Sequence, residues 1–111
     1  MKITDSTPKA DGFYMPSELA EHRCTYILWP ERGDNWRHNA EKAEHVFCQV
    51  ARTIAKYEPV IIGASPREYP VALDLNMPGV SVVEMTNNDS WIRDCGATFV
   101  VDGKGHMRVI K

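Results

Sequence analysis

The apolar residues of this chain fall into short continuous runs and one helical repeat. Three runs, at 25–29, 59–64 and 80–85, are rich in β-branched or aromatic side chains. Glycine, proline or polar residues flank each run, a pattern typical of buried strands. We therefore predict three strands in these ranges.

A different spacing lies between the first two runs. Apolar residues there recur at intervals of three and four, which predicts one apolar face of a helix from about Trp36 to Lys56. Pro59 ends this helix and favours extended backbone at Glu58. The apolar positions are Ala43, Val46, Phe47, Val50, Ala51, Ile54 and Ala55.

A second, shorter helix is predicted between the second and third strands. Ser65 is a suitable N-cap, with Pro66 at the first helical position and Glu68 at the third. Pro70 would then lie inside the helix and should shorten or kink it. Leu73 and Leu75 would form its apolar side.

The last part of the chain predicts a hairpin. Residues 98–101 and 107–110 are apolar runs joined by the Gly-rich sequence Asp102-Gly103-Lys104-Gly105. Residues 1–16 predict an extended arm.

The order strand, helix, strand, short helix, strand, loop, hairpin predicts an α/β fold with a mixed sheet. Because the last predicted strand stops at Lys111 without a turn, we expect residues 1–111 to be one partial domain.

Composition narrows the class of protein. The chain has 111 residues, of which 43% are hydrophobic and 25% charged, with a net charge of -2. There is no basic patch for nucleic acid and no apolar run of the length needed to span a membrane. Cys24, Cys48 and Cys95 are odd in number and irregularly spaced, which favours reduced thiols. We therefore expect a cytoplasmic protein.

The most informative stretch is Asn87-Asn88-Asp89-Ser90-Trp91-Ile92-Arg93-Asp94, which follows the third predicted strand. The carboxyl ends of strands are where α/β sheets place ligand sites. Asp94 could accept paired hydrogen bonds from a guanidinium, and Trp91 could lie against its face. The alternative is that Arg93 and Asp94 form surface ion pairs and Trp91 is a core residue.

Four ordered motifs resemble the agmatine deiminases of the guanidine-modifying (pentein) superfamily. They are DGFYMP at 11–16, WPER with DNWR at 29–37, YEPV at 57–60 and NNDSWIRDCG at 87–96. Members of that family are several times longer, so the resemblance covers only their amino-terminal part. It implies the first blade, and the start of the second, of a five-bladed α/β propeller.

The resemblance also implies a reaction. Agmatine deiminases hydrolyse agmatine to N-carbamoylputrescine and ammonia, on the route to putrescine, through a cysteine thiouronium intermediate and without a cofactor. Asp94 matches a guanidinium-binding, catalytic carboxylate, and Trp91 matches an aromatic residue that lines the pocket. Asn88, Asp89 and Arg93 are expected to support the loop, with Arg93 pointing away from Asp94. A homo-oligomer of the full-length protein is compatible with this interpretation.

This chain departs from the family in what it lacks. Nothing in it resembles the Gly-rich segment that carries the nucleophilic cysteine, or the segment with the acid/base histidine, so we expect it to be inactive alone. Cys95 has no histidine placed near it by any sequence feature. We expect it to start the next strand as a small buried residue.

Other functions remain open at this stage. The chain could be a short, non-catalytic protein that binds a cationic amine, or that pairs with a longer deiminase subunit through an open sheet edge. Within the same class, a peptidylarginine or arginine deiminase is the alternative. His22, Cys24, His45 and Cys48 do not have the spacing of known zinc modules, so no metal is expected. Neither His38 nor His106 has a nearby partner that suggests catalysis.

Overall fold

The computed structural model describes residues 1–110 and divides into two compact units. One unit is 22–94, and the other combines 1–21 with 95–111. Lys111, the end of the predicted domain, lies outside the described residues. Each unit is described below by itself.

Unit 22–94 is built on a three-stranded parallel sheet. Its strands are β1 (Thr25–Leu28), β2 (Val60–Ala64) and β3 (Val80–Glu84), in that spatial order. In register, Thr25 is opposite Val60, and Val60 is opposite Val80. The three predicted strands are therefore confirmed to within one residue at each end.

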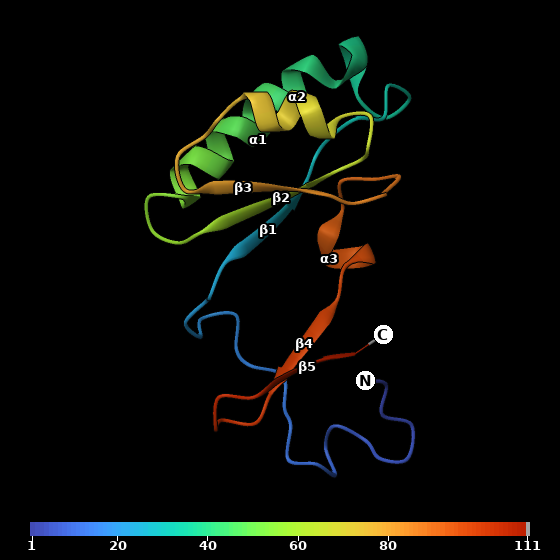
Figure 1. Ribbon diagram of the computed structural model, residues 1–111, viewed down its shortest axis with the longest axis vertical. Helices are drawn as coiled ribbons and strands as arrows, with labels where there is room; N and C mark the ends of the chain where they lie inside the picture. The colour runs from blue at the N-terminus through green and yellow to red at the C-terminus, as the bar shows by residue number, and fades with distance from the viewer. Residues whose placement is uncertain (111) are drawn as a thin grey trace. The chain divides into compact units, whose positions relative to one another are not determined.

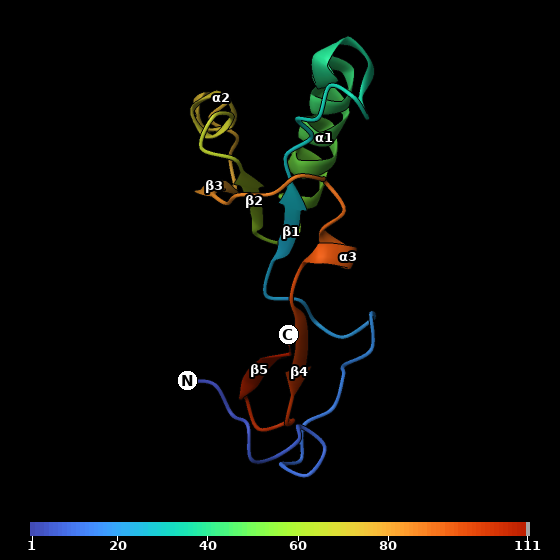
Figure 2. The same cartoon turned by 90° about the vertical axis from the view of Figure 1, so that its right-hand side faces the viewer.

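Both long connections cross on the same face of this sheet. The connections contain α1 (Glu41–Ile54) and α2 (Tyr69–Asp74), and Figures 1 and 2 show the two helices on one side of β1, β2 and β3. This arrangement follows from the sequential strand order, because right-handed crossovers between neighbouring parallel strands all return on the same side.

The core of this unit lies between the sheet and the two helices. Val60, Ile62 and Ala64 of β2 are no more than 1% exposed and share one cluster with Ala51 of α1 and Ala72 of α2. Burying an aliphatic side chain as large as Ile62 contributes about 1.5–3 kcal/mol. The opposite face is less covered, with Tyr26, Val83 and Met85 at 40%, 38% and 37% exposed.

The predicted long helix is confirmed over Glu41–Ile54, but its predicted start at about Trp36 is wrong. Residues Arg37–Ala40 form a short 3-10 turn (η1) in which His38, Asn39 and Ala40 have φ of 55°, 54° and 70°, so α1 begins at Glu41. The predicted apolar face is also too wide. Val46 and Val50 are 52% and 46% exposed, because the small side chains of Ala51 and Cys48 are the ones that face the sheet.

The second helix starts later than predicted. Ser65 and Glu68 close a turn, with the amide of Glu68 donating to the carbonyl of Ser65 at 3.0 Å, and α2 follows from Tyr69. Pro70 is therefore in the first turn of α2, where a missing N–H is tolerated. Of the two predicted effects of Pro70, the helix is short, at six residues, and it has no kink at Pro70. Ala72 is the buried residue, while Leu73 and Leu75 are exposed.

The other unit contains the predicted hairpin. Strands β4 (Thr98–Val101) and β5 (Met107–Ile110) pair antiparallel, and Tyr14 of the arm bridges to Val101. Parallel and antiparallel pairs thus lie in two separate sheets of the described chain instead of the one mixed sheet predicted. The α/β class itself is confirmed. A single helical turn, α3 (Ile92–Cys95), spans the boundary between the units.

Candidate functional site

Three loops meet at the carboxyl edge of the parallel sheet. They follow β1 (29–36), β2 (65–68) and β3 (85–91), all within unit 22–94. Parallel strands direct their following loops to the same edge, and such edges are where open α/β sheets bind ligands. The two loops that carry the family-like motifs, WPER with DNWR and NNDSWIRD, are the outer two of the three.

A guanidinium joins these two outer loops. Arg32 donates from Nε to Asp34 Oδ1 at 3.0 Å and from Nη2 to Asp34 Oδ2 at 2.5 Å. Its remaining nitrogen, Nη1, donates to the carbonyl of Asn88 at 3.2 Å and lies 3.9 Å from Asp89 Oδ2. The hydrogen bonds from Arg32 hold the pKa of Asp34 below its usual value, and Asp34 raises the pKa of Arg32.

Besides its ion pair with Arg32, Asp89 accepts two hydrogen bonds. Its Oδ1 accepts from the amide of Ser90 at 2.8 Å, which fixes the local turn, and its Oδ2 accepts from Asn35 Nδ2 at 3.5 Å. Asn88 contributes its carbonyl to Arg32. Both residues thus have the contacts expected of loop-supporting residues, and their role toward a substrate stays a prediction.

Trp91 and Asp94 lie one turn apart. The amide of Asp94 donates to the carbonyl of Trp91 at 3.1 Å, and α3 carries Asp94. Trp91 is 61% exposed, so the alternative in which it is a core residue is wrong. An exposed indole and an exposed carboxylate on one turn have the chemistry to bind a flat cation.

The residues beside Asp94 differ from expectation in their backbone. Arg93 lies in the helical turn α3 and not in an extended segment, which was the reason for expecting it to point away from Asp94. Cys95 ends α3 and is exposed instead of starting β4 as a buried residue. A four-residue helix is too short to show a helical repeat of apolar residues, so the pattern did not predict it.

A part-buried polar contact at the same edge was not predicted from the sequence. Ser65 Oγ donates to Glu31 Oε2 at 2.5 Å and thereby links the loops after β1 and β2. Glu31 Oε1, Trp29 Nε1 and Asn87 Oδ1 are shielded and have no hydrogen-bond partner among the described residues. The motif WPER contains Glu31, but its neighbours along the chain do not indicate that Ser65 is its partner.

The histidines and cysteines do not form a metal site in residues 1–110, where no group of three or more potential ligands comes together. His22 Nδ1 lies 3.4 Å from Glu58 Oε1, and Cys48 is buried in the core. His106 does have a carboxylate partner, contrary to expectation. Its Nδ1 lies 2.6 Å from Asp102 Oδ2 in the β4–β5 turn.

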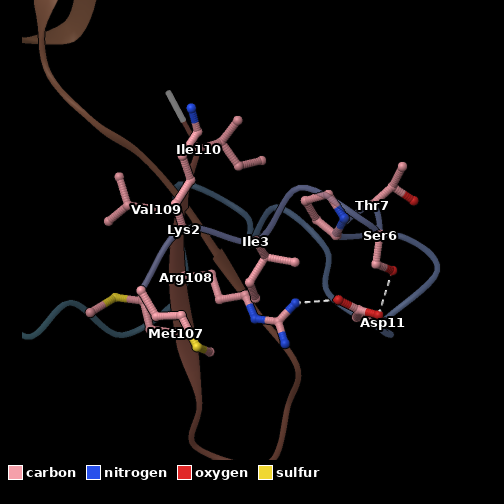
Figure 3. A pocket seen from close by; sticks show the side chains of 11 residues that line it. Lys2, Ile3, Ser6, Thr7, Asp11, Met107, Arg108, Val109 and Ile110 are labelled. Atoms are coloured by element: carbon pink, nitrogen blue, oxygen red, sulfur yellow. Dashed lines mark hydrogen bonds and ion pairs between the residues drawn. The ribbon is translucent and has the colours of Figure 1, made fainter.

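A separate groove lies in the other unit. It has a volume of about 730 Å³ and runs between the arm and β5. Figure 3 shows Arg108 reaching Asp11, which also accepts a hydrogen bond from Ser6 at 2.7 Å. The guanidinium carbon of Arg108 also lies 4.1 Å from the centre of the Phe13 ring, so Arg108 of β5 contacts the arm at two residues. None of the predicted site residues lines it.

Comparison with known proteins identifies the family. Residues 14–110 match the Porphyromonas-type peptidyl-arginine deiminase family, and the chain belongs to it. It is 48% identical over 97% of its length to the agmatine deiminase of Stutzerimonas stutzeri. It is 38% identical to the solved agmatine deiminase of Enterococcus faecalis over 97% of its length, with a TM-score of 0.94.

The chain spans about 30% of the length of each of these relatives. The expectation that it corresponds to a part of a longer deiminase sequence is therefore confirmed. No helix in the described part of the chain is long and apolar enough to cross a membrane.

Proposed function

We propose that this chain is the amino-terminal part of an agmatine deiminase and supplies one wall of its substrate site. Asp94 would bind the guanidinium, and Trp91 would lie along the substrate. The observation that carries the proposal is the turn that joins these two exposed side chains at the edge of the parallel sheet. The agmatine deiminases among the relatives favour agmatine over the peptidylarginine of the family description.

The chemistry explains why a carboxylate is needed. A guanidinium is a delocalised cation and a poor electrophile, so its plane and its charge must be held while the carbon is attacked. An ionised carboxylate does both. A thiolate then adds to the central carbon, ammonia leaves and a thiouronium forms. Water displaces the thiolate to give N-carbamoylputrescine, with a histidine moving the protons.

The thiolate and the histidine would come from segments for which these 111 residues hold no counterpart. Cys95 is the one cysteine near Asp94 in sequence, and it follows Asp94 directly. Our proposal gives it no catalytic role, because no sequence feature places a histidine beside it as a base. By this proposal the 111-residue chain is inactive alone.

We also propose that the fold is one blade, and the start of a second, of a five-bladed propeller. Unit 22–94 completes a β1-α1-β2-α2-β3 layer, and the β4–β5 hairpin then begins a separate sheet. A chain that finishes one sheet and starts another is what a repeating blade architecture requires.

The proposed setting is the cytoplasm, with agmatine as the small-molecule partner and a homo-oligomer for the full-length protein. Cys24, Cys48 and Cys95 form no disulfide in the described part of the chain, which suits a reducing compartment.

The first test is the intact mass of the native polypeptide together with its activity. We expect a mass several times the 12.6 kDa of this chain, and release of ammonia from agmatine. Arginine and a peptidylarginine should be turned over much more slowly. A native mass of 12.6 kDa would favour the non-catalytic alternative, and preference for peptidylarginine would favour the alternative within the class.

A further inference from the structure

The guanidinium of Arg32 connects two loops that are far apart in the chain. Its Nη1 donates to the carbonyl of Asn88 at 3.2 Å, 56 residues away. In the sheet, β2 lies between β1 and β3, which these two loops follow. Arg32 therefore links the loops that follow the two outer strands of the sheet. We call this contact, with Asp34, Asn88 and Asp89, the Arg32 bridge.

The geometry of the bridge suits arginine and no other side chain. Asp34 takes Nε and Nη2 as a pair, which fixes the plane of the guanidinium and leaves Nη1 directed at Asn88. A lysine has a single nitrogen and cannot make the paired contact and the third contact in this fixed arrangement. The amide of Trp36 also donates to the carbonyl of Arg32 at 2.9 Å, so the backbone of Arg32 is held as well.

Two further contacts of the loop after β3 are local. Asn87 Nδ2 donates to the carbonyl of Met85 at 3.0 Å, and Asp89 Oδ1 accepts from the amide of Ser90. These contacts shape the loop but do not fix it relative to the rest of unit 22–94. The amide of Met85 donates to the carbonyl of Ala64 at 2.7 Å and holds the start of the loop to β2. Farther along the loop, the Arg32 bridge ties Asn88 and Asp89 to the loop after β1, assisted by the 3.5 Å contact of Asn35 Nδ2 with Asp89 Oδ2.

The carboxylates at this edge differ in whether they take part in the Arg32 bridge. Asp34 is fully engaged by Arg32, and Asp89 divides its oxygens between the amide of Ser90 and the side of Arg32 and Asn35. A guanidinium substrate that approaches the edge would therefore meet two carboxylates already facing a resident guanidinium. Asp94, outside the bridge, is the remaining acidic group of the motif.

We propose that Arg32 is a positioning residue, which holds the loop of Asn87–Trp91 so that Trp91 and Asp94 are placed for the substrate. The identity of the substrate in this proposal rests on the proposed function. The positioning of the loop rests on the contacts of the Arg32 bridge. Arg32 itself does not touch the substrate.

The test compares Arg32→Gln with Arg67→Gln in the full polypeptide. Arg67 is a matched control, because it lies in the loop after β2 and its ion pair, at 2.9 Å, is with its chain neighbour Glu68. Arg32→Gln should lower kcat/KM for agmatine about 10- to 100-fold, the cost of a small misplacement of a binding group. Most of the loss should be in KM. Arg67→Gln should behave like the wild type.

A second measurement follows the loop directly. Hydrogen–deuterium exchange of the backbone amides in 86–94 should be faster in Arg32→Gln, and unchanged in Arg67→Gln. Arg32→Lys should recover only part of kcat/KM, because it restores the charge but not the paired hydrogen bonds. Asp34→Asn should lower kcat/KM and speed amide exchange in 86–94 by smaller amounts. If Arg32→Gln does not fold, Asp34→Asn replaces it as the test variant.

The outcomes separate the two proposals. Unchanged exchange in both Arg32→Gln and Asp34→Asn would overturn the inference, and so would faster exchange with an unchanged kcat/KM. Full recovery by Arg32→Lys would also overturn it, because charge alone would then suffice. A wild-type protein that does not act on agmatine would overturn the proposed function first, whereas an active wild type with normal Arg32 variants would overturn this inference alone.

Discussion

The backbone amide of Asp94 donates a 3.1 Å hydrogen bond to the carbonyl of Trp91. This single turn places an indole and a carboxylate next to each other on a short element, α3 with the residue before it. The carboxylate offers charge and the indole offers a flat polarisable face. The two contributions can therefore be removed separately by mutation.

Replacing Asp94 by Asn should nearly abolish agmatine turnover in the full polypeptide. The change keeps the size of the side chain but removes the charge that holds the guanidinium. Loss of one aligned electrostatic partner lowers kcat by about 100-fold or more. Steady-state ammonia release measures it. Asp74→Asn in α2, which is also exposed, is the control and should retain normal turnover. Near-normal activity of Asp94→Asn would remove this residue from the site.

Replacing Trp91 by Ala should mainly raise KM for agmatine, by about tenfold, because a cation–aromatic contact is worth roughly 1–2 kcal/mol when partly desolvated. Trp91→Phe should recover part of the loss. Tyr57→Ala is the matched control, since Tyr57 is an exposed aromatic residue in another loop, at 86% exposure. Equal KM values for Trp91→Ala and the wild type would show that the ring does not contact the substrate.

The strands could be predicted because each carries its own signal. Val60–Ala64 is apolar on both faces and bounded by Pro59 and Ser65, which is a local pattern. The start of α1 could not be predicted in this way. Positive φ at His38, Asn39 and Ala40 ends any helix there, but none of these residues is glycine, the usual marker of that conformation.

The site was predictable only in part, for a related reason. Asp94 and Trp91 are close in sequence, so a motif contains both. The contact of Arg32 with Asn88 and that of Glu31 with Ser65 join separate loops. Such contacts depend on strand order, and the order β1-β2-β3 is not encoded in any one segment.

Replacing Gly79 by Ala should lower the free energy of unfolding by about 1–2 kcal/mol, the cost of a left-handed backbone for a residue with a Cβ. Gly79 has φ of 74°, and an added Cβ would lie 3.2 Å from both the Cβ and the carbonyl oxygen of Ala55. Urea unfolding would measure the change. Gly33→Ala is the control, because its Cβ would make only an ordinary contact of 3.5 Å with Asn39. Equal unfolding free energies for the two variants would contradict this account.

The β4–β5 turn should lose stability in acid through Asp102. Burial raises the pKa of Asp102, but hydrogen bonds from the His106 side chain and from the amides of Lys104 and His106 outweigh it and lower the pKa to about 2. A lowered pKa means that the stabilisation is complete above the ordinary aspartate pKa of about 3.9. It is then lost as the pH falls toward about 2.

Amide chemical shifts of Lys104 and His106, followed by NMR between those two pH values, would measure this step. Asp102→Asn should remove it, because the variant has no carboxylate to titrate, whereas Asp74→Asn should leave it in place. A step that persists in Asp102→Asn would assign the transition to another group.

The parallel sheet has a consequence for the order in which the chain can fold. Thr25 pairs with Val60, so β1 has no strand partner until α1 and β2 have been synthesised, and β3 must follow before the Arg32 bridge can close. The β4–β5 hairpin pairs neighbours such as Val101 and Met107 and can form at once. Non-local pairings are the slow ones in folding. The edge that carries the candidate site should therefore be among the last parts of unit 22–94 to form, both on the ribosome and after denaturation.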